Sequence, residues 1–507
     1  MNNDPNHPSS SSRRNFIKSA SKSATGLAAG AAIVRQHATS ARAAESIPGS
    51  SQRLRIGVIG AGRRGFGAHI RALVNLRASG TNIDIAGVND VFSVYRDRAV
   101  DYIKTETGVQ PKTYVDYREM LADESIDAVT IGTPDHWHAL QAIDALKAGK
   151  HVYCEKPMTH TVEEGREVIQ AWRDSGLVMQ VGVQSTSSPV WDEIREMIND
   201  GKLGKIVQFQ TECSRNSAAG MSRHNEITPE MTPTNVDWDR WLGVEQGLNP
   251  KLEFDRSTFG QWRCYWPYGY GMFTDLFVHR ITGMLKATGL RYPGRVVGGG
   301  GIFMEYDDRE VTDVASLIAD FHEGVQAMVC STMVSEASKI EHVIRGHHGS
   351  ITVSKPTYGS GPKGSFDFVP ERPQVTGNSK LKPEHYERSC ARNYNEEHFQ
   401  NFIDAIQQGD PGAVNNDPDL AAAAVMMVNL AVRSYREGKV FQIDRSGKVA
   451  GGDESWAKNW EAMSKAKAKP RHVPGWRAGD TGSTFTPFPY QSLAGPWKNG
   501  TDPASGN

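Results

Sequence analysis

The sequence predicts an α/β protein, with a doubly wound parallel sheet in its N-terminal part and, after it, an α+β domain with an open, largely antiparallel sheet. From residue 54 onward, apolar strand-like segments alternate with helical segments of about 10–15 residues, which is typical of a parallel sheet. Beyond residue 311, strand-like segments with β-branched alternation follow one another, which favours antiparallel pairing. The length of 507 residues allows two or three domains of roughly 100–200 residues each.

Composition and charge exclude several classes of protein. Hydrophobic residues make up 38% of the chain, which together with its glycines lies in the globular range and excludes a wholly disordered chain. The 57 basic and 58 acidic residues leave a net charge of -1, so the chain as a whole has no positive field for nucleic acid or an anionic membrane. We therefore predict no nucleic-acid partner, and no membrane partner beyond an export step.

The first 43 residues differ in charge from the rest. They carry six basic groups and one acid, and without them the chain has 51 basic and 57 acidic residues, a net charge of -6. Ser12–Lys18 (SRRNFIK) is similar to the twin-arginine export motif, residues 23–34 are uncharged but too few to span a bilayer, and Ala41–Ala43 fits a signal cleavage site. We expect residues 1–43 to be a twin-arginine signal peptide, which places the protein in the periplasm or otherwise outside the cytoplasm. The alternative is a disordered basic tail.

The first folded segment carries a dinucleotide-binding pattern. Residues 54–60 form an apolar strand that ends in glycine, and a helical stretch with Ile70, Leu73 and Val74 on one face follows. Between them lies G-x-G-x-x-G, in which the glycines allow a tight turn, close approach of a pyrophosphate and close packing of helix on strand. The sequence therefore predicts a Rossmann domain over residues 44–184, and the turn consists of Gly60, Gly62, Arg63, Arg64 and Gly65.

A second strand, residues 83–90, closes on Asp90, 25 residues after Gly65, where about 20 are expected. A carboxylate at this position accepts hydrogen bonds from the ribose hydroxyls and repels a 2′-phosphate. NAD is therefore favoured over NADP, although Arg63, Arg64 and Arg96 could offset the repulsion. The alternative is a structural aspartate that caps the next helix.

Two later strand ends read TPDHWH (residues 133–138) and EKP (residues 155–157). With the glycine turn, they resemble the Gfo/Idh/MocA family of glucose–fructose oxidoreductase and inositol dehydrogenase relatives. The resemblance implies that Thr133, Pro134 and His138 line the nicotinamide ribose and that Glu155 and Lys156 stand beside the nicotinamide ring. It continues through residues 182–184 and adds Gln184 to the expected cofactor contacts. An ammonium at Lys156 can stabilise alkoxide character as hydride leaves carbon.

A second constellation comprises Asp275 and His279, which lie four residues apart and so on one face of a helix. In the family pattern this histidine is a catalytic acid/base or binds substrate, and Asp275 would orient it or hold a neighbouring hydroxyl. The family often has an acid three residues after this histidine, where this chain has Thr282. The alternatives are a buried hydrogen bond or a metal pair, but no third His or Cys lies at ligand spacing, so we predict no metal site.

The rest of the chain is expected to form a substrate-binding and catalytic domain over residues 185–445 and an extended tail over residues 446–507. Residues 356–392 are rich in Pro, Gly and charge and predict a long loop. Five aromatic residues between 262 and 270 suit either a pyranose platform or a packed domain interface. By resemblance, the outer face of the C-terminal sheet forms a homo-oligomer interface.

Together these features predict an exported NAD(P)-dependent oxidoreductase that acts on a sugar, polyol or glycoside hydroxyl. Because no free NAD is available outside the cytoplasm, the cofactor should be tightly bound and restored within each cycle. One alternative is an NAD-dependent glycoside hydrolase that oxidises the sugar transiently and eliminates the aglycone. The other is a non-catalytic sugar-binding protein on the same fold.

Overall fold

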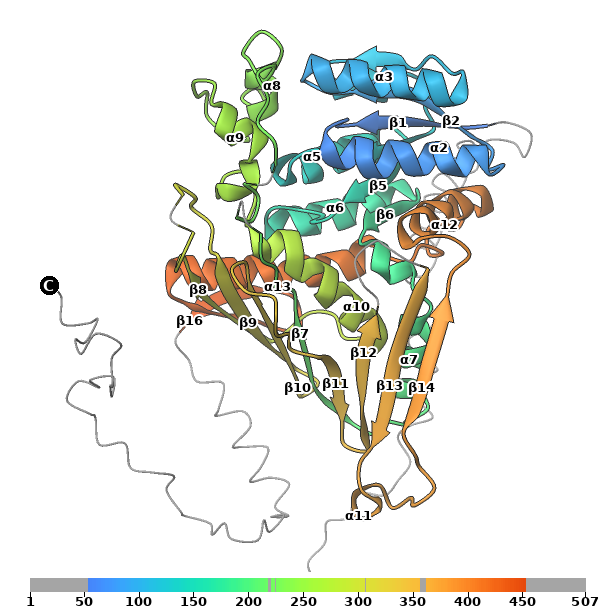
Figure 1. Ribbon diagram of the computed structural model, residues 1–507, viewed down its shortest axis with the longest axis vertical. Coiled ribbons are helices and arrows are strands. Elements are labelled where there is room, and N and C mark those ends of the chain that lie inside the picture. The colour runs from blue at the N-terminus through green and yellow to red at the C-terminus, as the bar shows by residue number, and fades with distance from the viewer. Residues whose placement is uncertain (1–52, 218–219, 224, 306, 356–361, 453–507) are drawn as a thin grey trace, which may run out of the picture. The chain divides into compact units, whose positions relative to one another are not determined.

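The computed structural model describes residues 53–452, except 218–219, 224, 306 and 356–361 (Figure 1). The expected signal peptide lies outside the described residues, as does the expected tail from residue 453 onward. Among the described residues, no helix is long and apolar enough to cross a membrane.

The N-terminal part is built on one parallel sheet, as predicted. Its strands lie in the order β3-β2-β1-β4-β5-β6, and every neighbouring pair is parallel. The order turns back between β1 and β4, the switch point at which doubly wound sheets bind ligands beyond the carboxyl ends of their strands. The strands are β1 (Leu54–Ile59), β2 (Ile83–Asn89), β3 (Lys112–Tyr114), β4 (Ala128–Ile131), β5 (His151–Glu155) and β6 (Met179–Gly182). The helices are η1 (Gly65–Ile70), α2 (Arg71–Ala78), α3 (Ser93–Thr107), α4 (Tyr117–Ala122), α5 (Asp135–Lys147) and α6 (Val162–Ser175).

The C-terminal part is built on an open sheet of ten strands in the order β14-β13-β12-β11-β7-β10-β9-β8-β15-β16. β7 and β10 pair parallel and the other neighbours pair antiparallel, which confirms the predicted open, largely antiparallel sheet. The strands are β7 (Ile206–Glu212), β8 (Arg295–Gly301), β9 (Val314–Phe321), β10 (Val325–Thr332), β11 (His342–Gly346), β12 (Gly349–Lys355), β13 (Lys363–Pro370), β14 (Glu384–Ser389), β15 (Val440–Ile443) and β16 (Val449–Gly452).

Helices pack between and beside the two sheets, and α10 and α13 lie along the second sheet in Figure 1. They contact β7, β8 and β9, and α13 also contacts α6. Helix α12 packs against α2, so a segment late in the chain completes the core of the N-terminal part. The helices are η2 (Gln184–Ser187), α7 (Val190–Asn199), α8 (Trp238–Leu242), α9 (Arg256–Gly260), η3 (Trp262–Cys264), η4 (Phe273–Phe277), α10 (Val278–Thr288), α11 (Pro373–Thr376), α12 (Tyr394–Gln408) and α13 (Pro418–Glu437).

The ends of α13 are defined by local sequence signals. The Asp417 side chain accepts a hydrogen bond from the amide of Leu420, Pro418 occupies the first position, and Gly438 ends the helix in the left-handed conformation. The alanine-rich turns that follow Leu420 are buried. Their small side chains allow the helix to approach both the sheet and α6.

The prediction of a long loop over residues 356–392 is wrong for about half of that range, where β13, α11 and β14 lie. β13 buries Phe366 and Phe368 between polar neighbours. β14 is the exposed edge of the sheet, where charged side chains discourage further strand pairing. The charge that indicated a loop therefore belongs to an edge strand.

Candidate active site

The glycine turn has the geometry that its sequence predicts. Gly60 adopts φ +83°, a conformation that L side chains rarely take. A Cβ atom on Gly65 would lie 1.8 Å from the carbonyl oxygen of Gly60, so only glycine allows the helix to pack this closely on the strand. The helix begins as the π-helix η1. The strand, turn and helix predicted here are confirmed.

Asp90 lies at the end of the neighbouring strand and is buried. Its carboxylate accepts hydrogen bonds from the amide of Ala61 at 2.7 Å and from that of Phe92 at 2.8 Å. Burial raises the pKa of Asp90 to about 6. The N-cap of α3 is Phe92, without a side-chain hydrogen bond. Asp90 therefore braces the glycine turn, and the helix-capping alternative does not describe it.

Two adjoining cavities lie at the carboxyl edge of the parallel sheet. We call one, of about 680 Å³, the glycine-turn cavity and the other, of about 760 Å³, the lysine cavity. Of the predicted site residues, the glycine-turn cavity is lined by Gly60, Gly62, Arg63, Arg64, Asp90, Thr133 and Pro134. The lysine cavity is lined by Arg63, Arg64, Thr133, His138, Glu155, Lys156, Gln184, Asp275 and His279. Gly65 is instead packed against Gly60.

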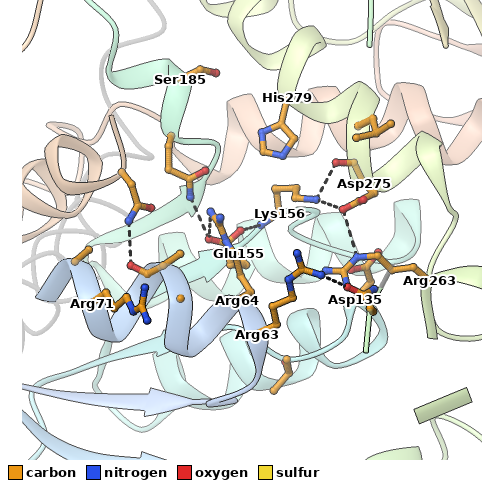
Figure 2. Close-up of a pocket in the computed structure, with 18 of the residues that line it drawn as sticks. Arg63, Arg64, Arg71, Asp135, Glu155, Lys156, Ser185, Arg263, Asp275 and His279 are labelled. Carbon is orange, nitrogen blue, oxygen red and sulfur yellow. Dashed lines mark hydrogen bonds and ion pairs between the residues drawn. The ribbon is translucent and has the colours of Figure 1, made fainter. Parts of the chain in front are cut away.

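Lys156 and Asp275 meet in the lysine cavity (Figure 2). Nζ of Lys156 donates to Oδ1 of Asp275 at 2.6 Å and to its carbonyl oxygen at 2.9 Å. Nε of Arg263 lies 3.3 Å from the same Oδ1 atom. Burial alone would raise the pKa of Asp275, but Lys156 and Arg263 hold it well below its usual range. The carboxylate is therefore ionised and fixes the position of the Lys156 ammonium group.

Glu155 occupies the floor of the lysine cavity. Its Oε1 atom lies 2.8 Å from Arg64, 3.1 Å from Nε2 of His69 and 3.1 Å from the side-chain amide of Gln184. Burial would raise the pKa of Glu155, but Arg64 and the hydrogen bond from His69 hold it below its usual range. Glu155 therefore joins the glycine turn to β5 and carries a negative charge at the cavity floor.

His279 lies at the start of α10, directly after the π-helix η4 that carries Asp275. Both side chains line the lysine cavity, as their spacing predicts. Figure 2 shows His279, Lys156 and Asp275 together. Burial and the nearby Lys156 ammonium lower the pKa of His279 well below its usual value. The imidazole is therefore neutral near pH 7.

His138 contacts two backbone carbonyl oxygens through its two ring nitrogens. Its Nδ1 atom lies 2.6 Å from the carbonyl oxygen of Pro157, and its Nε2 atom lies 2.9 Å from that of Thr133. These bonds tie the two motif segments together at the cavity wall. The side chain of Thr282, at the family's usual acid position, donates to the carbonyl of Val278 within its own helix.

Two residues that line the lysine cavity are not among those predicted from the sequence. Arg263 lies in the aromatic stretch between residues 262 and 270, and its charge among those rings is a signal that it faces a polar partner. Asp135 lies within the TPDHWH motif, is buried, and accepts a hydrogen bond from Thr274 at 3.1 Å. Burial raises the pKa of Asp135.

A segment of the C-terminal part, residues 225–263, covers the glycine-turn cavity, and we call it the covering segment. Its Trp241, Phe259 and Trp262 line that cavity opposite the glycine turn. It is fixed to the N-terminal part through a backbone bond from Asp237 to Val91 at 3.0 Å and through Trp137 Nε1, which donates to the Trp241 carbonyl at 2.8 Å.

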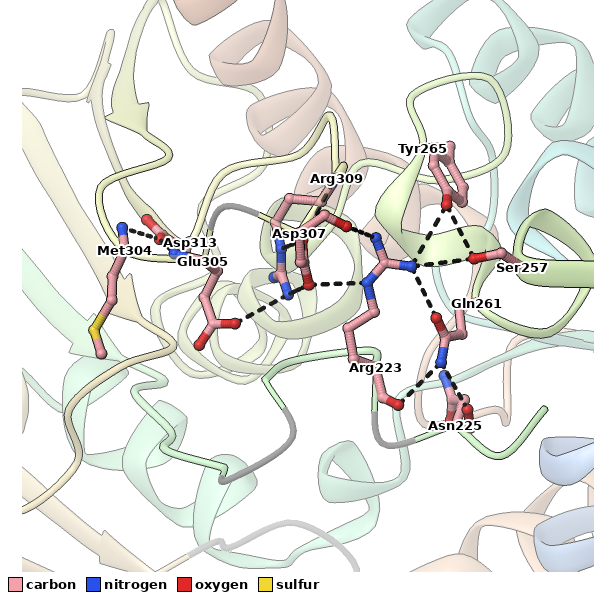
Figure 3. A network of polar contacts seen from close by, with 10 residues as sticks. All are labelled: Arg223, Asn225, Ser257, Gln261, Tyr265, Met304, Glu305, Asp307, Arg309 and Asp313. Carbon is pink, nitrogen blue, oxygen red and sulfur yellow. Dashed lines mark hydrogen bonds and ion pairs between the residues drawn. The ribbon is translucent and has the colours of Figure 1, made fainter.

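The covering segment is also fixed from the other side. Asn225 accepts a hydrogen bond from Arg63 at 2.5 Å, and Gln261 donates to the Asn225 carbonyl at 3.0 Å. Gln261 also accepts from Arg223, whose guanidinium pairs with Asp307 at 2.9 Å (Figure 3). These contacts connect the loop between β8 and β9 to the glycine turn.

The aromatic residues between 262 and 270 mainly pack against protein. Tyr268 is buried with Trp241, Tyr270 stacks on His160 at 4.1 Å, and Trp266 lies against Tyr435. In the described part of the chain, none of these aromatics lines the lysine cavity. The packed-interface alternative therefore fits Trp266, Tyr268 and Tyr270, whereas Trp262 lines the glycine-turn cavity. Within the described ranges, no three His, Cys, Asp or Glu side chains gather as a metal site requires.

Comparisons with known proteins agree with this architecture. Residues 54–183 match the model described as the oxidoreductase family, NAD-binding Rossmann fold, and residues 247–352 match that of the GFO/IDH/MocA C-terminal domain. A glycosyl hydrolase family 109 protein of Shewanella baltica is 34% identical over 169 residues, 31% of this chain and 36% of that protein. The match thus spans about a third of that curated relative's length.

Two solved structures resemble the described fold. The aldose-aldose oxidoreductase from Caulobacter crescentus, complexed with glycerol, has a TM-score of 0.56 at 18% identity and covers 77% of this chain and 100% of its own. A levoglucosan dehydrogenase in complex with NADH and levoglucosan has a TM-score of 0.55 at 18% identity and covers 80% of this chain and 100% of its own. At this identity the likeness shows a shared fold.

Proposed function

Because the chain belongs to the Gfo/Idh/MocA oxidoreductase family, we propose that it is an NAD-dependent oxidoreductase that oxidises a hydroxyl group of a sugar, polyol or glycoside. The observation that carries the proposal is the partly buried Lys156 ammonium, 2.6 Å from the Asp275 carboxylate, in a cavity that adjoins the glycine-turn cavity. A cation held there can bind a substrate hydroxyl beside a nicotinamide ring.

The residues around the glycine-turn cavity fit a dinucleotide. The missing side chains of Gly60 and Gly62 leave the turn open to a pyrophosphate, and Asp90 lies where ribose hydroxyls would be bound. When bound, NAD would serve as the acceptor of a hydride from the carbon that bears the hydroxyl. We infer NAD rather than NADP because the Asp90 carboxylate disfavours a 2′-phosphate.

The side chains of the lysine cavity would bind the substrate hydroxyl and accept its proton. Lys156 donates a hydrogen bond to the substrate hydroxyl oxygen and stabilises the negative charge that develops on it. His279 is neutral, so a ring nitrogen can accept the hydroxyl proton as the carbonyl forms. Asp275 positions Lys156, and Arg263 holds the same carboxylate oxygen of Asp275. In the overall reaction the alcohol loses one proton and one hydride.

We further propose that the cofactor stays bound through catalysis. The covering segment lines the glycine-turn cavity together with residues of the Rossmann sheet, and its contacts with Val91, Trp137 and Arg63 hold it there, where it would help to retain a dinucleotide. Such retention suits the export that we propose from the twin-arginine pattern at Arg13 and Arg14. We also propose that the protein forms a homo-oligomer through the outer face of the C-terminal sheet.

A second candidate function is glycoside hydrolysis by transient oxidation, elimination of the aglycone, addition of water and reduction. The observation that favours it is the 34% identity with the glycosyl hydrolase family 109 protein, although only 36% of that protein is matched. The two candidates use the same lysine cavity and differ in whether the glycosidic bond is cleaved.

The test is to denature purified protein, identify any released nucleotide by mass spectrometry, and screen free sugars and glycosides while following the absorbance of reduced nicotinamide. We expect bound NAD(H) that is reduced by one sugar and reoxidised by another. Release of a free aglycone would identify the glycosidase instead. Protein that neither contains nor takes up NAD, and turns nothing over, would be the non-catalytic binding protein and would refute both schemes.

A further inference from the structure

In the described part of the chain, two residues other than glycine have a left-handed backbone, and they lie at the two ends of one ion pair. Ser222 has φ +66° and precedes Arg223, and Asp308 has φ +64° and follows Asp307. Nε of Arg223 donates to Oδ2 of Asp307 at 2.9 Å (Figure 3). This conformation is costly for L residues, although aspartate and asparagine tolerate it better than most. The left-handed serine is therefore the less usual of the two.

The neighbours of Ser222 hold it in this conformation. Met221, the residue before it, is buried in the core. After it, the carbonyl oxygen of Arg223 accepts a hydrogen bond from the side-chain amide of Gln261 at 3.0 Å, and the Arg223 guanidinium donates to Oε1 of Gln261 at 2.8 Å. Strained residues persist only where their surroundings fix them, and they concentrate at ligand-binding and active sites. Ser222 is therefore fixed on both sides.

Ser222 lies in the wall of the lysine cavity. Only 4% of its surface is exposed, and it lines the same cavity as Lys156 and His279. Its carbonyl oxygen accepts a hydrogen bond from the amide of Asn225 at 3.3 Å, whereas no hydrogen bond joins its hydroxyl to another of the described residues. Because a buried hydroxyl usually has a hydrogen-bond partner, this one is placed to find its partner in a molecule bound in the cavity.

Glycine would form the same turn without strain, and serine differs from glycine by a single hydroxymethyl group. A function of the hydroxyl would therefore account for the strained residue. We propose that Ser222 determines substrate specificity: its hydroxyl forms a hydrogen bond with a hydroxyl of a pyranose bound in the lysine cavity, other than the hydroxyl that is oxidised. Both hydroxyls donate and accept, so they are matched in chemistry. The proposal rests on the proposed oxidoreductase function.

The first experiment measures binding by titration calorimetry to protein loaded with NADH, which cannot oxidise a sugar. The probes are D-glucose and D-galactose. We expect at least one to bind, and Ser222→Gly to bind it about 3–10-fold more weakly because one hydrogen bond is lost. The melting temperature of Ser222→Gly should equal or exceed that of wild type, because glycine relieves the strain. Unchanged affinity, or no binding of either sugar to wild type, would overturn the proposal.

Deoxy analogues of the sugar that binds separate a direct contact from a structural effect. The analogue that lacks the hydroxyl bound by Ser222 should have equal affinity for wild type and for Ser222→Gly, whereas the other analogues should still lose about 3–10-fold. Ser222→Ala lacks the hydroxyl but keeps the strain, so it should show the same pattern at a lower melting temperature than Ser222→Gly. An equal loss for every analogue would overturn the direct contact.

Asp308→Gly is the matched control. Asp308 has nearly the same φ as Ser222, but it is exposed and lines neither the lysine cavity nor the glycine-turn cavity. We expect this variant to bind the parent sugar and all the analogues with wild-type affinity. A loss of affinity equal to that of Ser222→Gly would show that the backbone of the network matters rather than the hydroxyl, and the proposal would fall.

The bound nucleotide separates this proposal from the proposed function. If a sugar binds through Ser222 but no sugar changes the absorbance of bound nicotinamide, the Ser222 contact stands and the oxidoreductase function fails. If sugars reduce the nucleotide and Ser222→Gly lowers neither affinity nor kcat/KM, the oxidoreductase function stands and the Ser222 contact is refuted. Nucleotide content should be the same in wild type and in all three variants.

Discussion

Nζ of Lys156, at the end of β5, lies 2.6 Å from Oδ1 of Asp275 in the π-helix η4, although 119 residues separate them in sequence. The pair joins the parallel sheet to the C-terminal part at the lysine cavity. Because Arg263 contacts the same carboxylate oxygen, Asp275 holds two cations in fixed positions. A substrate hydroxyl bound here meets an ammonium group whose position is already set.

Replacement of Lys156 should therefore abolish most catalysis without unfolding the protein. We expect Lys156→Ala and His279→Ala each to lower turnover by roughly 100-fold or more and to leave bound nucleotide and melting temperature near wild type. Steady-state kinetics on the best sugar from the screen would measure this. Asp275→Asn should lower turnover while Lys156 remains present, and wild-type rates in all three variants would remove the lysine cavity from the reaction.

Two helical glycines carry opposite expectations for an added side chain. A Cβ atom on Gly65 would lie 1.8 Å from a carbonyl oxygen, whereas one on Gly165 of α6 would meet no atom closer than 3.7 Å. We expect Gly65→Ala to lose bound nucleotide and to lower the melting temperature, and Gly165→Ala to leave the nucleotide content and the melting temperature near wild type. Nucleotide content per chain after gel filtration is the measurement, and retention in Gly65→Ala would contradict the packing argument.

Nucleotide preference should depend on Asp90. Asp90→Ser removes a hydrogen-bond acceptor for the ribose hydroxyls and also removes the negative charge that repels a 2′-phosphate. Affinity for NAD should therefore fall about 10-fold, and the preference for NAD over NADP should narrow. Asp84→Ser is the control, because Asp84 lies on the same strand but pairs with Arg53 and Arg77 instead. Unchanged selectivity in Asp90→Ser would assign Asp90 a bracing role only.

The covering segment should govern how firmly the cofactor is retained. Trp262 lines the glycine-turn cavity, whereas Trp266, four residues later, packs against Tyr435. We expect Trp262→Ala to lose nucleotide on dialysis against NAD-free buffer, while Trp266→Ala keeps it at the wild-type level. Equal retention in the two variants would show that the segment does not hold the cofactor.

Acid should destabilise the folded chain over a defined range. Burial lowers the pKa of His136 to about 3 and those of His151, His160 and His398 to about 4. The unfolded chain binds protons at these groups below about pH 6.5 and the folded chain does not, so stability present above pH 6.5 is lost as the pH falls toward 4.

Each such histidine adds up to about 1.4 kcal/mol per pH unit to the slope of the free energy of unfolding against pH. Asp90, whose pKa of about 6 is raised by burial, acts in the opposite direction over part of the range. Urea unfolding at pH 7.5, 6 and 5 measures the slope. His151→Gln should show a shallower dependence than wild type, and a free energy of unfolding that is flat with pH would contradict the burial of neutral histidines.

The sequence predicted the local parts of the molecule well, because each carries its cause within a few residues. The strand before Gly60, the turn, and the spacing of Asp275 and His279 on one face all appear as expected. Prediction failed at β13, which lies between β12 and β14, and at the edge strand β14, because the charged residues around them resemble a loop until the pairing of the strands is known. It also missed Arg263, whose carboxylate partner comes from another element.

The sequence by itself determined which chemistry is available: a dinucleotide turn, a lysine after β5, and a histidine four residues beyond an aspartate. Only the tertiary structure decided which of these groups meet. Asp275 holds Lys156 because the phase of η4 and the packing of α10 against the second sheet bring them together. Such contacts depend on side-chain packing between distant segments, which no local pattern encodes.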